Sequence, residues 1–148
     1  MIKNYTSSVA AARSVSHIEE ALAEHGAQSV LKQYDSETRK LVAVSFFMQI
    51  GNKLIPFRLP ARSDQVFKIF CAKMKRTTPG ILAKAQEQAE RTAWKIISDW
   101  IDAQMALVDL QQAEIAEIFM PYMWNDRLGK SFYQIAQDKG FNMLEAPK

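Results

Sequence analysis

The long stretch from Pro79 to Met120 constrains this chain more than any other feature. It contains no further proline and, after Gly80, no strong helix stop. Thr78 is a suitable N-cap, and Pro79 suits the first helical turn because its missing N–H would be unpaired there. A continuous helix of this length would measure about 60 Å, at ~1.5 Å per residue. That exceeds the diameter of a compact domain of this size.

The apolar residues of this stretch follow helical spacing on two faces. One face carries Trp94, Ile97, Ile101, Val108, Ile115 and Phe119, and the other carries Ile96, Trp100, Ala103, Leu107, Leu110 and Ile118. A helix that is apolar on more than half of its circumference is either central to its own domain or shared with another chain. The weakly apolar first turns, Ala83 to Arg91, are expected to project into solvent. A homodimer through this helix is therefore one expectation.

Three strands are predicted before the long helix, over Val30–Tyr34, Leu41–Ile50 and Lys53–Leu59. Every even position of the middle strand is apolar, which is typical of a sheet with one buried face. The Gly-Asn pair between the last two strands indicates an antiparallel hairpin. Pro56 cannot donate a backbone hydrogen bond, so it places the third strand at an edge.

Short helices are predicted on both sides of these strands. Ser16 as N-cap, with Glu19 as its capping-box partner, predicts a helix over Ser16–His25. Ser63 is expected to cap a second helix, and Ser131–Lys139 is expected to form the last one. The chain shows neither an internal repeat nor a low-complexity linker. We therefore expect a single α+β domain over residues 1–148, with a three-stranded antiparallel sheet, a short N-terminal helix, one long helix and a short C-terminal helix.

Charge is distributed unevenly along the chain, whose net charge is +3. Residues 1–52 carry five basic and five acidic residues, residues 53–95 carry ten basic against three acidic, and the remainder carries four basic against eight acidic. Basic residues neutralise phosphates and exposed aromatic rings stack on bases, so the basic region (53–95) is a candidate nucleic-acid-binding region. Its candidate contacts are Arg58, Arg62, Lys68, Lys73, Lys75, Arg76, Arg91 and Lys95, with Phe47 and Tyr34 as stacking surfaces. The alternative is that these charges are the solvated faces of a strand and two helices.

Large aromatic residues define a second candidate surface, which would bind a partner protein. Its members are Trp94, Trp100, Tyr122 and Trp124. The alternative is that the tryptophans of the long helix anchor it to the sheet and that the neighbouring charges are its polar edge.

The sequence contains no pattern typical of a catalytic, cofactor or metal site. Leu128-Gly129-Lys130-Ser131 ends like a phosphate-binding loop, but the first glycine of that motif would fall on Trp124. His17 and His25 are eight residues apart, a spacing that we expect to place them on different helical faces. We therefore expect no catalytic residue, no cofactor and no metal ion. This expectation favours a protein that is not an enzyme, but the sequence does not decide the question.

The composition indicates a cytoplasmic protein. The first eight residues lack the apolar core of a signal peptide, and no stretch is apolar enough to span a membrane. Cys71 is the only cysteine, so no internal disulfide can form, which fits a reducing compartment.

Two resemblances add to this interpretation. The order helix, three antiparallel strands, helix resembles that of double-stranded-RNA-binding domains, although the lysine cluster that those domains carry at the start of their second helix is replaced here by Arg62-Ser63-Asp64-Gln65. The opening Asn4-Tyr5-Thr6-Ser7-Ser8-Val9, the strand end Ile55-Pro56-Phe57-Arg58-Leu59-Pro60, and the segments Ala93 to Gln104 and Phe119 to Tyr122 resemble a family of short proteins of bacteriophages, prophages and other mobile elements. This second resemblance implies an accessory role and transfers no catalytic residue.

The sequence thus leads to two hypotheses about function. The first is a non-catalytic accessory protein of a phage or mobile element that binds DNA or RNA through residues 53–95. The alternative is a protein-binding adaptor or inhibitor of a host defence complex that uses the long helix and the aromatic tail.

Overall fold

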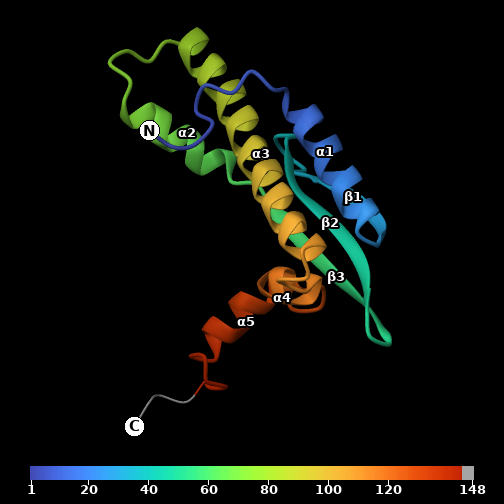
Figure 1. Ribbon diagram of the computed structural model, residues 1–148. Helices are drawn as coiled ribbons and strands as arrows, with labels where there is room; N and C mark the ends of the chain where they lie inside the picture. Colours follow the sequence, from blue (N-terminus) through green and yellow to red (C-terminus); the bar gives the residue numbers. More distant parts are fainter. Residues whose placement is uncertain (145–148) are drawn as a thin grey trace.

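The computed structural model describes residues 1–144, and its centre is an antiparallel sheet of order β1-β2-β3 (Figure 1). The strands are β1 (Ala27–Tyr34), β2 (Leu41–Ile50) and β3 (Lys53–Pro60). Phe46 lies opposite both Val30 of β1 and Phe57 of β3, so apolar side chains align on one face. Gly51 turns the β2–β3 hairpin with a φ of 58°, a backbone region that favours glycine. The predicted strands, hairpin and edge position of Pro56 are confirmed.

One face of the sheet is covered by α1 (Ala11–Glu24) and α3 (Pro79–Asp109), which lie side by side in Figure 1. The helices and the sheet bury a common core whose fully enclosed members include Val15, Ile18, Leu22, Val44, Phe46, Phe57, Leu59, Trp94, Ile101 and Phe119. Phe46 and Phe57 stack at 5.0 Å, and Phe119 meets Phe46 edge-on at 5.2 Å. These aromatic contacts join the sheet to the helices.

Helix α1 begins at Ala11, earlier than the predicted start at Ser16. Its N-cap, Ala10, provides no side-chain hydrogen bond. Ser14 and Val15, which precede the predicted start, are buried, as are Ile18 and Leu22 further along. These residues lie at helical spacing and form one buried stripe. Burial of this stripe stabilises the first turns of the helix, so no capping side chain is needed.

Helix α2 (Ser63–Ala72) packs against the N-terminal half of α3. Ala85 and Ala89 are therefore buried, and the prediction that the first turns of α3 project into solvent is wrong. Thr78 caps α3 as predicted, because its hydroxyl accepts a hydrogen bond from the Ile81 N–H at 3.3 Å. Ser63 does not cap α2, whose N-cap position is taken by Arg62.

The stretch from Pro79 to Met120 is not one continuous helix, because α3 ends at Asp109. Helix α3 has 31 residues, which corresponds to about 46 Å. Gln111 takes a φ of 59°, and the Leu107 carbonyl accepts a hydrogen bond from the Gln112 N–H at 2.9 Å. The chain then restarts as α4 (Ile115–Phe119), whose Phe119 reaches the core. Burial of Phe119 explains why the chain turns back where no glycine or proline requires it.

The C-terminal part adds a small hairpin and a helix beyond the sheet edge. A 3₁₀ turn (Met120–Tyr122) leads to β4 (Trp124–Asn125), β5 (Lys130–Ser131) and α5 (Phe132–Asp138). A backbone bridge joins Met123 to Phe57 of the edge strand β3. The predicted last helix is present, Ser131 caps it, and Gly140, with a φ of 64°, follows its end. The bridge fixes the hairpin against the sheet.

Candidate nucleic-acid interface

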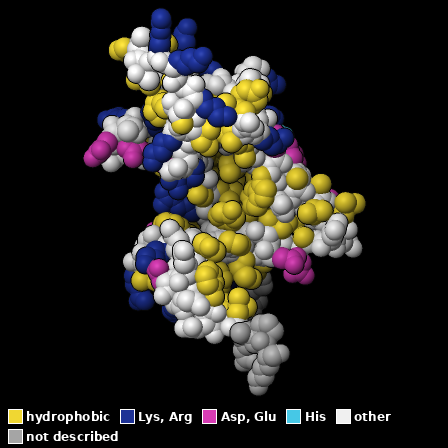
Figure 2. All heavy atoms as spheres, turned by 90° about the vertical axis from the view of Figure 1, so that its left-hand side faces the viewer, with side chains coloured by type: hydrophobic (Ala, Val, Ile, Leu, Met, Phe, Trp, Pro, Cys, Tyr) yellow, Lys and Arg dark blue, Asp and Glu magenta, His cyan; other side chains and the backbone are white. Residues whose placement is uncertain are grey.

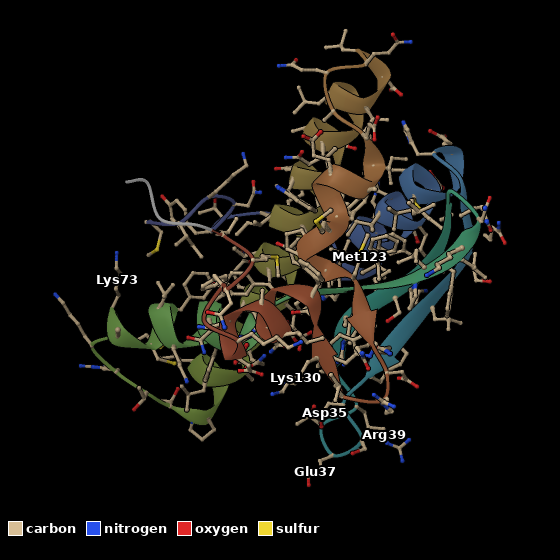
Figure 3. All side chains as sticks on the ribbon, turned by 90° about the horizontal axis from the view of Figure 1, so that it is seen from below. Asp35, Glu37, Arg39, Lys73, Met123 and Lys130 are labelled. Carbon is tan, nitrogen blue, oxygen red and sulfur yellow. The ribbon has the colours of Figure 1, made fainter. Side chains whose placement is uncertain are left out.

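Four predicted phosphate contacts lie exposed at one end of the molecule. Lys68 lies on α2, and Lys73, Lys75 and Arg76 follow it in the connection to α3. Within residues 1–144, none of the four forms an ion pair. Figure 3 shows Lys73 pointing away from the body of the protein at the end of α2. We call Lys68, Lys73, Lys75 and Arg76 the basic end.

The structure shifts this cluster relative to the predicted helix. Helix α2 ends at Ala72 and Lys73 is its C-cap, so Lys75 and Arg76 lie beyond the helix. Packing of Val66 and the partly buried Phe67 and Phe70 into the core holds α2 in place. The cations therefore lie on a short connection between two packed helices, where their side chains are free to meet a ligand.

Arg58 and Arg62 lie apart from the basic end, next to the edge of the sheet. The guanidinium of Arg58 lies over the Trp124 ring, 4.8 Å from its centroid, which is a cation–π contact. The Arg62 side chain donates two hydrogen bonds to the Asp64 carboxylate, at 3.1 and 3.0 Å. These bonds lower the pKa of Asp64 to about 2. Arg62 is therefore already neutralised, whereas Arg58 has no carboxylate partner in the part of the chain that the structure describes.

Arg91 and Lys95, the last two predicted phosphate contacts, take part in internal contacts on α3. Arg91 donates to the Gln88 side-chain oxygen at 2.7 Å, and Lys95 pairs with Asp99 at 3.1 Å. Gln88 in turn donates to the carbonyl of Ser7 at 3.0 Å. These residues fasten α3 to the N-terminal segment, so they are less available to phosphate than the basic end.

The same contacts explain why the N-terminal segment and the middle of α3 belong together. Asn4 donates to the Asp99 carboxylate at 2.9 Å, and the buried Thr92 hydroxyl donates to the Asn4 carbonyl at 2.9 Å. Burial raises the pKa of Asp99, but hydrogen bonds from Asn4 and Lys95 outweigh it and leave that pKa below its ordinary value. We call Asn4, Gln88, Thr92, Lys95 and Asp99 the N-terminal clamp.

The four predicted partner-binding aromatics separate into interior and surface positions. Trp94 is 1% exposed and belongs to the core, so its side chain is not available to a partner. Trp100 is partly buried and meets Phe119 and Tyr122 edge-on, at 5.8 and 5.7 Å. Trp124 lies on the β4–β5 hairpin beside Arg58. Of the two tryptophans on the long helix, Trp94 thus anchors it to the core, as the alternative interpretation stated.

A pocket of about 560 Å³ lies between the β3 edge, the β4–β5 hairpin and the start of α5. Its walls include Arg58, Tyr122, Trp124 and Tyr133. A second hollow, of about 640 Å³, lies between the end of β3, the β1–β2 turn and α2, and includes Lys68. The two share Arg58, Pro60 and Arg62, so they are neighbours on the surface, and we call the pair the groove. Figure 2 shows this face, with hydrophobic side chains across the waist and Lys and Arg side chains on its flank and above it.

The acidic side chains that line the groove form hydrogen bonds or ion pairs with neighbouring groups. Asp64 is paired with Arg62, as described above. Asp35 accepts hydrogen bonds from the backbone N–H groups of Thr38 and Glu37, at 2.8 and 2.9 Å, and these bonds lower its pKa. Figure 3 shows that the β1–β2 turn with Asp35, Glu37 and Arg39 protrudes from the sheet. Both aspartates stay ionised, but the lining carries Lys40, Arg58, Arg62 and Lys68 against them, so the groove has an excess of positive charge.

Two residues that line the groove, Tyr133 and Lys40, were not predicted from the sequence, and the two predicted stacking residues lie elsewhere. Tyr133, 51% exposed on α5, lines the pocket, and Lys40 lines the second hollow while pairing with Glu90 at 3.8 Å. Phe47 and Tyr34, the predicted stacking surfaces, line neither hollow. The capping box at Ser131 indicated where α5 begins, but no local signal indicated that the hairpin before it joins the β3 edge.

The opposite side of α3 carries acidic residues paired with histidines. His17 of α1 contacts Asp102 at 2.6 Å, and His25 contacts Asp109 at 2.9 Å. The prediction that the two histidines lie on different helical faces is wrong, because both face α3. Within residues 1–144, no three His, Cys, Asp or Glu side chains gather as a metal site requires. The two pairs join α1 to α3, and we call them the histidine seam.

Comparison with known proteins gave no match among protein-family models, curated proteins or solved structures. No helix within residues 1–144 is both long enough and apolar enough to cross a membrane. The argument for function therefore depends on the geometry of the basic end and the groove.

Proposed function

We propose that this protein is a non-catalytic nucleic-acid-binding protein that contacts its ligand through the basic end and the groove. The observation that carries the proposal is the group Lys68, Lys73, Lys75 and Arg76, which is exposed and, among the described residues, without ion pairs, beside a groove containing Arg58 and Trp124. Unpaired cations next to an aromatic-lined depression suit a strand with a negative backbone and flat bases.

The distribution of charge over the molecule supports this direction of binding. The acidic residues of the histidine seam lie on the α1 side of α3, whereas the basic end lies on α2, on the other side of that helix (Figure 1). A polyanion would therefore be attracted to the α2 side and repelled from the seam. The accessory role in a phage or mobile element rests on the resemblance of the long-helix and N-terminal residues alone.

Salt-titrated fluorescence anisotropy tests the proposal with single-stranded and duplex DNA and RNA. We expect binding at about 50 mM salt, weakening steeply as salt rises. Removing Lys73 and Lys75 together should lower affinity for all sequences and reduce the salt slope by about 2, since each phosphate contact contributes ~0.9. A wild-type protein that binds none of the four ligands at low salt would contradict the proposal.

The double variant Arg13→Ala, Lys53→Ala is a matched control. It removes the same charge from α1 and from the β2–β3 hairpin, both distant from α2 in Figure 1, and neither residue forms an ion pair within residues 1–144. We expect it to bind as the wild type does, apart from a small effect of net charge. Equal losses in both double variants would indicate non-specific attraction without a defined site.

A protein-binding role is the second candidate, and a separate observation favours it. Residues 120–144 contain a concentration of exposed large apolar side chains, namely Met120, Leu128, Phe132, Tyr133, Phe141, Met143 and Leu144. Isolated exposed apolar residues are common, but such a concentration indicates a contact surface. A host or phage protein whose capture is abolished by Leu128→Ser and unaffected by Lys73→Ala would support the adaptor over nucleic-acid binding. A second copy of the chain is a further possible occupant, which light scattering would detect.

A further inference from the structure

The pocket at the end of the groove has the shape and chemistry of a site for one flat ring. The Arg58 guanidinium and the Trp124 ring form one wall, and the half-exposed Tyr133 contributes another. Tyr122 is held from behind by Trp100, 5.7 Å away. Among the described residues, the lining contains no aspartate or glutamate that would repel a phosphate.

Local backbone contacts hold this pocket in place before any ligand arrives. The Met123–Phe57 bridge attaches the segment to the sheet, and the Phe132 N–H donates to the Met123 carbonyl at 2.7 Å. Trp124 pairs with Ser131 across the β4–β5 hairpin, and the Asn125 side chain accepts from the Leu128 N–H at 2.9 Å. A preformed site loses less freedom on binding, which favours affinity.

The chemistry of these side chains selects an unpaired base. Every base has two flat faces that stack on aromatic rings and on arginine guanidinium groups, and in a duplex these faces are already covered by neighbouring bases. A pocket of about 560 Å³ accommodates a single base with its sugar, whereas an intact base pair inside a duplex cannot enter it. Arg58, which pairs with no carboxylate within residues 1–144, lines the same pocket and supplies a positive charge for the adjoining phosphate.

We propose that this pocket receives one unpaired nucleobase of a single-stranded nucleic acid whose backbone continues along the groove toward Lys68 and the basic end. This inference rests on the proposed function and specifies its substrate class. In this arrangement, Trp124 and Tyr133 select single strands. The basic end attracts phosphate independently of sequence.

The test compares single-stranded and duplex oligonucleotides of one sequence against the wild type, Trp124→Leu and Tyr133→Leu, with Tyr34→Leu as control. Tyr34 is 60% exposed at the end of β1 and lies outside the pocket. We expect both pocket variants to lose about 10-fold in affinity for the single strand, the effect of one stacking platform, and to keep the duplex affinity of the wild type. The control should keep both affinities.

The possible outcomes separate this inference from the proposed function. If the wild type binds neither ligand at low salt, both are wrong. If the wild type binds but Trp124→Leu and Tyr133→Leu keep its single-strand affinity, or lose duplex affinity equally, the pocket assignment is overturned and nucleic-acid binding stands. Circular dichroism checks folding, and the largely exposed Tyr133 provides a decisive variant if Trp124→Leu fails to fold.

Two small probes distinguish a base from a phosphate as the pocket's ligand. Tryptophan fluorescence of the wild type is titrated with a uridine mononucleotide and with inorganic phosphate. We expect saturable quenching by the nucleotide, absent in Trp124→Leu and absent with phosphate. Equal responses to both probes would overturn base recognition, and nucleotide affinity as high as that of the single strand would overturn the assignment to a strand.

Discussion

The basic residues of the α2 end and those in the middle of α3 belong to one stretch of sequence but differ in what they contact. Lys73 and Lys75 have no ionic partner within residues 1–144, whereas Arg91 binds Gln88 and Lys95 binds Asp99. The difference follows from what packs against each helix. The N-terminal segment covers the middle of α3, whereas Lys73, Lys75 and Arg76, on the connection between α2 and α3, are exposed.

This contrast shows that local charge density does not identify a binding surface by itself. A cation whose charge is used inside the fold contributes to stability, and one without a partner is available to a ligand. The N-terminal clamp and the basic end should therefore respond differently to substitution. Changes in the clamp should alter stability, and changes at the basic end should alter binding.

The largest effect on stability is expected from Trp94, a core residue of α3 that lies between the clamp residues Thr92 and Lys95 in sequence. Replacing Trp94 with Ala should lower the free energy of unfolding by about 3–5 kcal/mol, because the 1% exposed ring leaves a cavity. Urea denaturation followed by circular dichroism measures this loss. Trp124→Ala, in the pocket lining, is the matched control and should cost clearly less, about 1 kcal/mol. Equal losses would contradict the division between core and surface tryptophans.

A smaller loss is expected from Thr92→Val inside the clamp. The Thr92 hydroxyl is fully buried, donates to the Asn4 carbonyl at 2.9 Å and accepts from the Gln88 amide at 3.3 Å. Valine keeps the shape but removes both hydrogen bonds, at a cost of about 1–2 kcal/mol, because the Asn4 carbonyl still accepts from the Ser7 N–H and the Gln88 amide still donates to the Ser7 carbonyl. Thr92→Ser keeps the hydroxyl and should recover part of the loss. If valine is as stable as threonine in urea denaturation, the clamp does not hold the N-terminal segment.

Asp99→Asn should lower stability by about 1 kcal/mol near neutral pH, because it removes the charge that accepts from Asn4 and Lys95. The pKa of Asp99 lies below its ordinary value of 3.8, despite the opposing effect of burial. Its contribution is therefore present above the unfolded-state value and is lost as pH falls through the lower folded-state pKa. Unfolding measured from neutral to acid pH should show the gap between wild type and variant closing below about pH 4. A constant gap would exclude the carboxylate charge as its source.

Much of the fold could be predicted from the sequence because its signals are local. The alternation along β2, the Gly51-Asn52 hairpin and the Thr78 cap each act within a few residues, and all three are present. The break at Gln111 has no such signal. It depends on Phe119 entering a core that the sheet and α3 complete together, so it could not be read from the helix alone.

The candidate site was predicted less completely, for the same reason. The basic end consists of residues adjacent in sequence and could be found from composition. Arg58 of β3 and Trp124 of the β4–β5 hairpin meet at the pocket. They do so because a backbone bridge joins their sequence neighbours, Phe57 and Met123. Residue types indicate that Trp124 and Tyr133 are large and flat, but only the register of the hairpin against β3 brings them to the same depression.

The histidine seam provides a comparison with the basic end, since its charges are paired. The hydrogen bond to the Ala21 carbonyl raises the pKa of His25 above 6.5, burial opposes this shift, and Asp109 and Glu24 reinforce it. A raised folded-state pKa means that the stabilisation is complete below the unfolded-state value and is lost as pH rises through the folded-state value. Asp109→Asn should therefore destabilise the protein at about pH 5.5 more than at about pH 8.5, measured by thermal unfolding. The exposed Asp126→Asn is the control, and an equal pH dependence in both would contradict the pairing.

The smallest effect on stability is expected at the basic end. Lys73→Ala with Lys75→Ala should change the free energy of unfolding by about 0.5 kcal/mol or less, because both residues are exposed and unpaired within residues 1–144. Removing two neighbouring like charges also relieves their repulsion. We therefore expect a slight gain in stability at low salt, which fades at high salt. Parallel unfolding and anisotropy measurements on this double variant should separate an unchanged stability from a weakened affinity. A substantial loss of stability would mean that these lysines, like Lys95, already have a partner inside the fold, and the contrast between the two ends of the basic region would no longer hold.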